Sequence, residues 1–160
     1  MTDAAAAVLR ALDGRGWSIA AAESLTGGRV TATLVDVPGA SAHVRGGIVA
    51  YATDIKATQL GVDPDLLAER GPVDADVAVQ MAKGVRRALQ ADVGVATTGV
   101  AGPDPQDGKP VGTVHIAVVT PDEVVSSSLE LSGTRDEIRT RTVQSVLELA
   151  LTVVGGIRHP

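Results

Sequence analysis

The sequence predicts a single α/β domain: a three-layer α/β/α sandwich around a mixed, mostly parallel sheet. Short apolar runs that suit buried strands alternate with helical stretches over roughly the first hundred residues, an order typical of parallel sheets. Two strand patterns then follow over 111–119 and 124–131. The turn between them indicates a hairpin, which makes the sheet mixed. With 160 residues, 44% of them apolar, the chain has the size and composition of one folded domain.

Start and stop residues define the expected helices. Asp63, Asp74 and Thr134 suit helix N-caps, and Glu137 completes a capping box with Thr134. Thr53 is expected to cap a further short helix. In chain order we expect a helix over 3–13, a strand over 17–22, a helix ending near 35, a strand over 45–51, short helices ending at Gly61 and Gly71, a helix from Asp74 to about Gln90, strands over 93–97, 111–119 and 124–131, and a helix from Thr134 to about Val154, followed by a frayed tail from about 155.

Composition excludes several classes of function. Aromatic residues make up 1% of the chain and the net charge is -5, so base-stacking platforms and basic surfaces for nucleic acid are not expected. The chain has no cysteine, and its three histidines lack metal-ligand spacing, so we expect no metal and no cofactor. There is no apolar run of membrane-spanning length and no signal-peptide pattern. We therefore expect a soluble, cytoplasmic protein that binds neither nucleic acid nor membrane.

The first candidate site is the segment Glu23-Ser24-Leu25-Thr26-Gly27-Gly28, between a predicted strand and a predicted helix. Ligands of α/β sheets bind at such strand ends, and free amides in the first turn of a helix attract an anion or a developing oxyanion. Ser24 at this position suits a nucleophile. The alternative is structural: Thr26 caps the helix and Ser24 is a turn residue.

The second candidate is Lys56, which follows Tyr51 at the end of a predicted strand. If Thr53 caps the next helix, Lys56 falls in its first turn, where the helix dipole disfavours a cation, and burial would disfavour the charge further. A neutral lysine is a general base, which a serine without histidine or cysteine needs. The alternatives are an exposed, solubilising lysine and a tyrosine that belongs to the strand core rather than to a ligand site.

The third candidate is the Gly- and Pro-rich stretch from Thr98 to Pro110. Thr98, Gly99, Val100, Ala101 and Gly102 follow a strand and suit a phosphate or ribose cradle. The stretch is not a P-loop, because five residues rather than four separate Gly102 from Gly108 and no Ser or Thr follows the lysine. A plain connector of this length is uncommon in a small domain.

The fourth candidate is the pair Arg135 and Arg139, one turn apart near the start of the last helix. Two guanidinium groups so placed can reach one phosphate. The alternative is a capped, solvated helix with charge pairing along one face.

Taken together, these motifs resemble the CinA C-terminal domain family, the nicotinamide-nucleotide amidohydrolases (PncC). The resemblance extends over essentially the whole chain and rests on an ordered set: Ala22-Glu23-Ser24-Leu25-Thr26-Gly27-Gly28, Pro38-Gly39-Ala40-Ser41, Gly46-Gly47-Ile48-Val49-Ala50-Tyr51 with Lys56, Gly61-Val62, Gly99-Val100-Ala101-Gly102-Pro103-Asp104 and Lys109-Pro110-Val111-Gly112-Thr113-Val114.

The resemblance implies hydrolysis of nicotinamide mononucleotide to nicotinic acid mononucleotide and ammonia, in pyridine nucleotide salvage, by a serine and a lysine without metal. The serine matches Ser24 and the lysine Lys56. The substrate-binding set it implies is Thr26, Gly27, Gly28, Tyr51, Thr98, Gly99, Val100, Ala101, Gly102, Arg135 and Arg139. It also implies a homo-oligomer, with a dimer favoured. The alternative function is a catalytically silent nucleotide-binding module of the same fold.

The sequence departs from the family pattern in three places. Leu25 stands where the family often has cysteine, and Pro105-Gln106-Asp107 replaces a more glycine-rich loop. Larger family members carry an N-terminal domain similar to molybdopterin-binding folds. The whole chain, 1–160, is expected to be one amidohydrolase domain without that activity.

Overall fold

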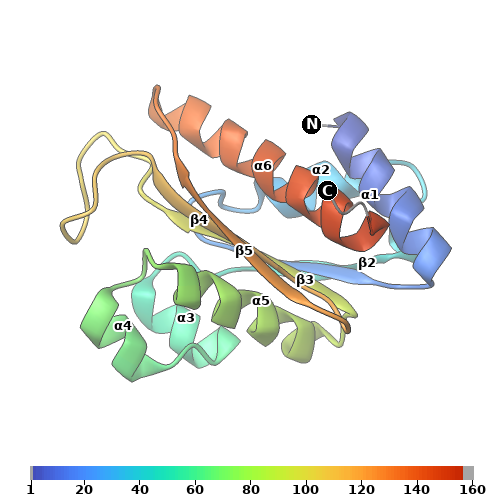
Figure 1. Ribbon diagram of the computed structural model, residues 1–160, viewed down its shortest axis with the longest axis horizontal. Coiled ribbons are helices and arrows are strands. Elements are labelled where there is room, and N and C mark those ends of the chain that lie inside the picture. The colour runs from blue at the N-terminus through green and yellow to red at the C-terminus, as the bar shows by residue number, and fades with distance from the viewer. Residues whose placement is uncertain (1, 157–160) are drawn as a thin grey trace.

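The computed structural model describes residues 2–156, which form a five-stranded sheet between two layers of helices (Figure 1). The strands are β1 (Ile19–Glu23), β2 (Val44–Val49), β3 (Val93–Gly99), β4 (Thr113–Val119) and β5 (Val124–Glu130), in the spatial order β2-β1-β3-β4-β5. β1 pairs in parallel with β2 and β3, whereas β4 is antiparallel to both β3 and β5. Four strands therefore share one direction and β4 opposes them, which confirms the mixed, mostly parallel sheet.

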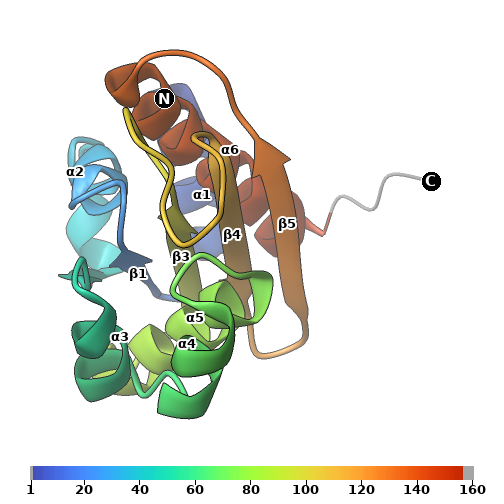
Figure 2. The same cartoon turned by 90° about the vertical axis from the view of Figure 1, so that its left-hand side faces the viewer.

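Three helices cover each face of the sheet, as Figures 1 and 2 show from two directions. One layer consists of α1 (Thr2–Arg15), α2 (Arg29–Val35) and α6 (Arg135–Gly155), and the other of α3 (Thr53–Leu60), α4 (Pro64–Arg70) and α5 (Ala75–Leu89). A single 3-10 turn, Ala40–Ala42, precedes β2. The three-layer α/β/α sandwich is confirmed.

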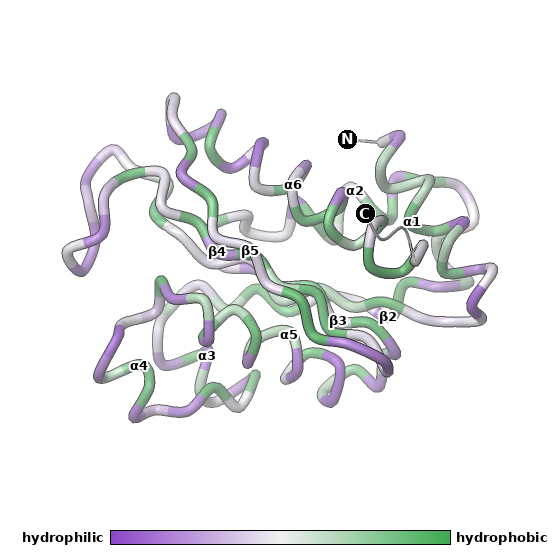
Figure 3. Tube along the Cα trace, in the orientation of Figure 1, coloured by the Kyte–Doolittle hydropathy of each residue, from purple (hydrophilic) through white to green (hydrophobic). Residues whose placement is uncertain are grey.

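The two faces of the sheet have different cores. Toward α1, α2 and α6 the strands present branched residues such as Ile19, Val95 and Ile116. Toward α5 they present mostly alanine, including Ala20 and Ala96. Small side chains let the α5 backbone approach the sheet closely, which replaces the missing aromatic filling. In Figure 3 the central strands and the helix faces turned toward them are hydrophobic.

Most helix boundaries lie where the cap residues predict them. The Asp63 and Asp74 side chains accept hydrogen bonds from first-turn amides, and Thr134 and Glu137 form the capping box. Thr53 is the exception: Ala52 is the N-cap of α3, with no side-chain hydrogen bond, and Thr53 is the first helical residue. The last helix reaches Gly155, and of the tail expected to fray, 157–160 lie outside the described residues.

The carboxyl ends of the three parallel strands meet at one edge of the sheet. Ser24 follows β1 directly, Tyr51 lies two residues after β2, and the loop 100–112 follows β3. β1 lies between β2 and β3: the chain passes from β1 through α2 to β2 on one face, and returns from β2 through α3, α4 and α5 to β3 on the other. Open α/β sheets bind ligands in the crevice at this kind of strand-order reversal.

Gly84 permits the closest contact between two helices of the α3–α5 layer. A Cβ at Gly84 would lie 1.9 Å from the backbone oxygen of Leu60, so α5 would have to move away from α3. We expect Gly84→Ala to lower the free energy of unfolding by about 1–3 kcal/mol, measured by urea denaturation. The control is Gly14→Ala in α1, where nothing lies within 4 Å and a gain of about 0.5–1 kcal/mol is expected. A Gly84→Ala protein as stable as the wild type would contradict this close packing.

Candidate active site

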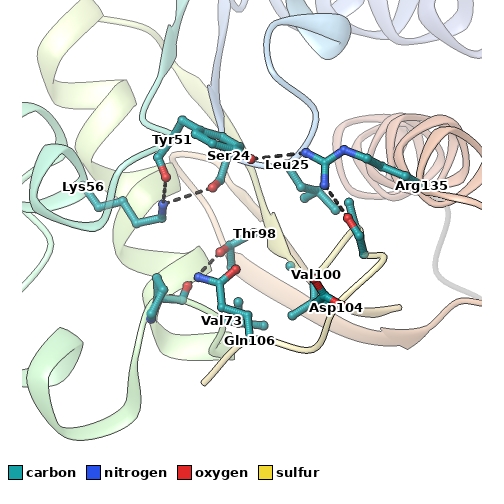
Figure 4. Close-up of a pocket in the computed structure, with 14 residues that line it drawn as sticks. Ser24, Leu25, Tyr51, Lys56, Val73, Thr98, Val100, Asp104, Gln106 and Arg135 are labelled. Atoms are coloured by element: carbon teal, nitrogen blue, oxygen red, sulfur yellow. Dashed lines mark hydrogen bonds between the residues drawn. The ribbon is translucent and has the colours of Figure 1, made fainter. Parts of the chain in front are cut away.

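A buried lysine contacts a buried serine at the carboxyl edge of the sheet. Lys56 Nζ lies 3.0 Å from Ser24 Oγ, and the two side chains come from α3 and from the turn after β1 (Figure 4). Lys56 is 1% exposed and Ser24 7%. Lys56 Nζ also donates to the backbone oxygens of Ala50, at 2.8 Å, and Tyr51, at 3.2 Å. The proximity predicted for these two residues is present, and the alternative of an exposed, solubilising lysine is wrong.

Burial changes the protonation of Lys56. Desolvation lowers the pKa of its amine from 10.5 to about 8. No carboxylate among the residues of the structure forms an ion pair with it that would oppose this shift. In its neutral form the amine has two N–H donors and one lone pair. The carbonyls of Ala50 and Tyr51 can accept both hydrogens, and the lone pair is then free to accept the Ser24 hydroxyl hydrogen.

Backbone contacts hold the turn that carries Ser24. The Ser24 amide donates to the Thr97 oxygen at 3.1 Å, and the Gly27 amide closes the turn on the Ser24 oxygen at 3.1 Å. Thr26 is fully buried, and its hydroxyl bonds to that of Thr97 at 2.8 Å. The alternative that Thr26 caps the helix is wrong, because the N-cap of α2 is Gly28. Thr26 instead ties the turn formed by residues 24–27 to β3.

The expectation that free amides in the first turn of α2 bind an anion is wrong, because the Glu23 side chain accepts their hydrogen bonds. Its fully buried carboxylate accepts from the amide of Val30 at 2.8 Å and from the amide and hydroxyl of Thr31 at 3.0 and 2.8 Å. The protein's own carboxylate therefore occupies the positive end of α2. Near Ser24, the amides of Leu25 and Thr26 donate no hydrogen bond within residues 2–156, but Thr26 is fully buried.

The serine and lysine open into a pocket of about 150 Å³. Nine of the expected site residues line it: Ser24, Tyr51, Lys56, Thr98, Gly99, Val100, Ala101, Gly102 and Arg135. Four others expected at the site do not: Thr26, Gly27, Gly28 and Arg139. Five lining residues were not expected from the sequence: Leu25, Pro72, Val73, Asp104 and Gln106.

Long-range hydrogen bonds bring the segment 71–73 to the pocket as a wall. The Thr98 hydroxyl donates to the Pro72 oxygen at 2.7 Å, and Lys109 Nζ donates to the Val73 oxygen at 2.8 Å. In sequence, Gly71-Pro72 is only a helix stop, so no local signal indicates this role. The loop after β3 and the connection between α4 and α5 thus face each other across the pocket.

The two arginines of α6 have different positions. Arg135 donates to the Gly102 oxygen and, at 3.2 Å, to the Tyr51 hydroxyl, so its guanidinium lies at the pocket mouth (Figure 4). Arg139 donates to the Leu25 oxygen at 2.7 Å and to the Thr26 oxygen at 3.5 Å, on the backbone of the turn that carries Ser24. The two do not converge on one anion site as expected. Tyr51 is 63% exposed and is not a core residue.

Metal-ligand clusters and membrane-spanning helices are both absent from residues 2–156. Within residues 2–156 no group of three His, Asp or Glu side chains is arranged to hold a metal ion. None of the helices described here has the length and hydrophobicity needed to cross a membrane.

Fold and site together define an α/β protein whose serine–lysine pair opens into a pocket at the carboxyl edge of the sheet. The chain belongs to the CinA C-terminal domain family, which matches residues 1–154. A CinA-like protein of Frankia casuarinae is 53% identical over 94% of this chain, and one of Geobacter sulfurreducens is 44% identical over 89%. The chain spans about a third of each relative, 35% of the length in both cases.

Solved structures of the same family share the fold. The competence/damage inducible protein CihA from Agrobacterium tumefaciens superposes with a TM-score of 0.91 at 35% identity, covering 96% of this chain and 94% of that protein. The competence damage-inducible protein A (ComA) from Klebsiella pneumoniae gives a TM-score of 0.93 at 28% identity, covering 98% of each chain.

A substitution of Glu23 tests whether its carboxylate stabilises the start of α2, after the turn that carries Ser24. Glu23→Gln replaces one acceptor oxygen with a donor NH2 group, which leaves at least one of the Val30 and Thr31 donors unpaired in a buried place. We expect the free energy of unfolding to fall by about 1–3 kcal/mol in urea denaturation. The matched control, Glu130→Gln at the exposed end of β5, should change it by less than about 0.5 kcal/mol. Equal stability of the two variants would contradict the capping role of Glu23.

Proposed function

We propose that the protein is an amidohydrolase that converts nicotinamide mononucleotide to nicotinic acid mononucleotide and ammonia. The observation that carries the proposal is the 3.0 Å contact between Ser24 Oγ and a buried lysine amine whose pKa is lowered to about 8. A serine hydroxyl is a weak nucleophile until an adjacent base accepts its proton, and Lys56 supplies that base. Membership of the CinA C-terminal domain family supports the proposal.

The proposed reaction runs through a covalent ester. Neutral Lys56 takes the hydroxyl proton as Ser24 Oγ attacks the carboxamide carbon, which yields a tetrahedral oxyanion and an ammonium group on Lys56. The C–N bond then breaks, and Lys56 returns its proton to the leaving nitrogen, which departs as ammonia. Lys56 next removes a proton from water as the water attacks the ester carbon. The bond between the acyl carbon and Ser24 Oγ then breaks, Lys56 returns the proton to Oγ, and the acid leaves.

The free amide of Leu25 is the proposed oxyanion donor. It directly follows the proposed nucleophile, lines the pocket and donates no hydrogen bond within the described residues. Donors held in place before reaction stabilise developing negative charge without reorganisation. Arg139 donates to the carbonyls of Leu25 and Thr26, in the two peptide groups that follow the Leu25 amide, so we assign it to positioning this turn rather than to substrate.

The pocket size supports a substrate that inserts one aromatic ring. A cavity of about 150 Å³ lined by apolar side chains is known to accept benzene, and this pocket has about the same volume. The nicotinamide ring would fill it beside Ser24, with ribose and phosphate extending to the mouth. Arg135 lies there and is the cation proposed to face the phosphate.

The proposal also covers the pathway, the cellular compartment and the oligomeric state. We place the reaction in pyridine nucleotide salvage in the cytoplasm, and we propose that the protein acts as a homo-oligomer, with a dimer favoured. These statements stay predictions.

Ammonia release from nicotinamide mononucleotide tests the nucleophile and the base. We expect Ser24→Ala and Lys56→Met to lower kcat/KM by at least about 1,000-fold, because each removes one partner of the dyad. Arg141→Gln, on the exposed side of α6, is the control and should keep wild-type activity within about twofold. Equal rates in Ser24→Ala and the wild type would remove Ser24 from the mechanism. If the wild type binds nicotinamide mononucleotide but releases no ammonia, the protein is a nucleotide-binding module instead.

The pH dependence follows from the lowered pKa of Lys56. Catalysis needs the neutral amine, so kcat/KM should rise about tenfold per pH unit below pH 8 and level off above it. At pH 7 only about a tenth of the protein then carries neutral Lys56. Lys56→Arg, whose guanidinium stays charged, should be inactive throughout. A profile that is flat between pH 6 and 9 would contradict a lysine base.

A further inference from the structure

Gln106 is a pocket residue that the proposed mechanism leaves without a role. It lies on the loop after β3, and in Figure 4 its carboxamide rises from that loop into the pocket toward Thr98. Backbone hydrogen bonds of 3.1 and 2.8 Å pair Gln106 with Lys109, and Lys109 Nζ is bonded to the Val73 oxygen on the facing wall. Gln106 is exposed, and the turn that carries it is tied to the facing wall through Lys109.

The carboxamide of Gln106 has unused hydrogen-bonding capacity. Within residues 2–156 its side chain makes no hydrogen bond, although it carries two N–H donors and an acceptor oxygen. The Thr98 hydroxyl has already given its hydrogen to the Pro72 oxygen, so toward Gln106 it can only accept. No hydrogen bond within the described residues fixes the orientation of the Gln106 amide, so Oε1 is free to face a donor inside the pocket.

The substrate of the proposed reaction brings such a donor. The carbonyl oxygen of its reacting carboxamide is assigned to the Leu25 amide, so its NH2 group needs an acceptor elsewhere. Figure 4 places Asp104, the one carboxylate that lines the described pocket, beyond Val100 on the Arg135 side, away from the Ser24–Lys56 pair. Gln106 lies on the Thr98 side. We propose that Gln106 Oε1 accepts a hydrogen bond from the NH2 group of the substrate and so selects primary carboxamides over esters.

This inference rests on the proposed function, and a pair of substrates tests it. The probes are nicotinamide mononucleotide and the methyl ester of nicotinic acid mononucleotide, which has no N–H at the reacting group. Gln106→Met keeps the length of the side chain and removes the acceptor. We expect it to lower kcat/KM for the amide about fivefold to tenfold and to leave kcat/KM for the ester within twofold, since one neutral hydrogen bond contributes about that much. Gln144→Met, on α6 where Gln144 bonds to Glu148, is the matched control and should change neither.

A binding measurement separates failure of this inference from failure of the proposed function. In a Ser24→Ala background, calorimetry should show tighter binding of the amide than of the ester, and Gln106→Met should abolish the difference. If the wild type releases no ammonia but this difference is present and depends on Gln106, the proposed function fails and the recognition stands. If ammonia is released and Gln106→Met leaves the amide-to-ester ratio unchanged, the assignment of Gln106 is overturned.

Discussion

The site depends on the burial of one amine between two backbone carbonyls and a serine hydroxyl. The β1–β2 register sets this arrangement: Glu23 lies opposite Val49, and the Ala50 amide donates to the Glu23 oxygen at 2.8 Å. Ser24 and Ala50 thus leave neighbouring strands side by side, and α3 returns Lys56 to both within six residues of Ala50. A one-residue slip in register would separate the hydroxyl from the carbonyls that hold the amine. The chemistry is therefore fixed by strand pairing rather than by a flexible loop.

Much of this could be predicted from the sequence because the relevant signals are local or topological. Asp74 and the Thr134–Glu137 pair indicate where helices begin, because their side chains cap the first turn. Ser24 and Lys56 are 32 positions apart, yet each follows the end of a predicted strand, and parallel strands end at the same edge. The sequence predicts a lowered Lys56 pKa from the helix dipole and from burial, and burial is the cause in the structure.

The parts that sequence did not reveal depend on contacts between distant segments. Glu23 is the last residue of a strand, and the helix that it caps begins six residues later, after a turn through Gly27 and Gly28. The local sequence therefore does not indicate that Glu23 caps a helix. In the sequence Arg139 resembles a phosphate ligand. Its guanidinium instead donates to the Leu25 oxygen, because α6 packs against the turn that carries Ser24. The Pro72–Val73 wall likewise exists only through Thr98 and Lys109.

The same desolvation that lowers the pKa of Lys56 links substrate binding to catalysis in the proposed reaction. In the free protein Lys56 lines the pocket of about 150 Å³, and burial lowers its pKa to about 8. A ring that fills the pocket excludes water from it and disfavours the ammonium further, and a cationic pyridinium ring adds like-charge repulsion. Both effects act while the ring occupies the pocket and end when it leaves. The substrate therefore increases the neutral fraction of the base that acts on it, whereas at neutral pH most molecules of the free protein hold Lys56 protonated.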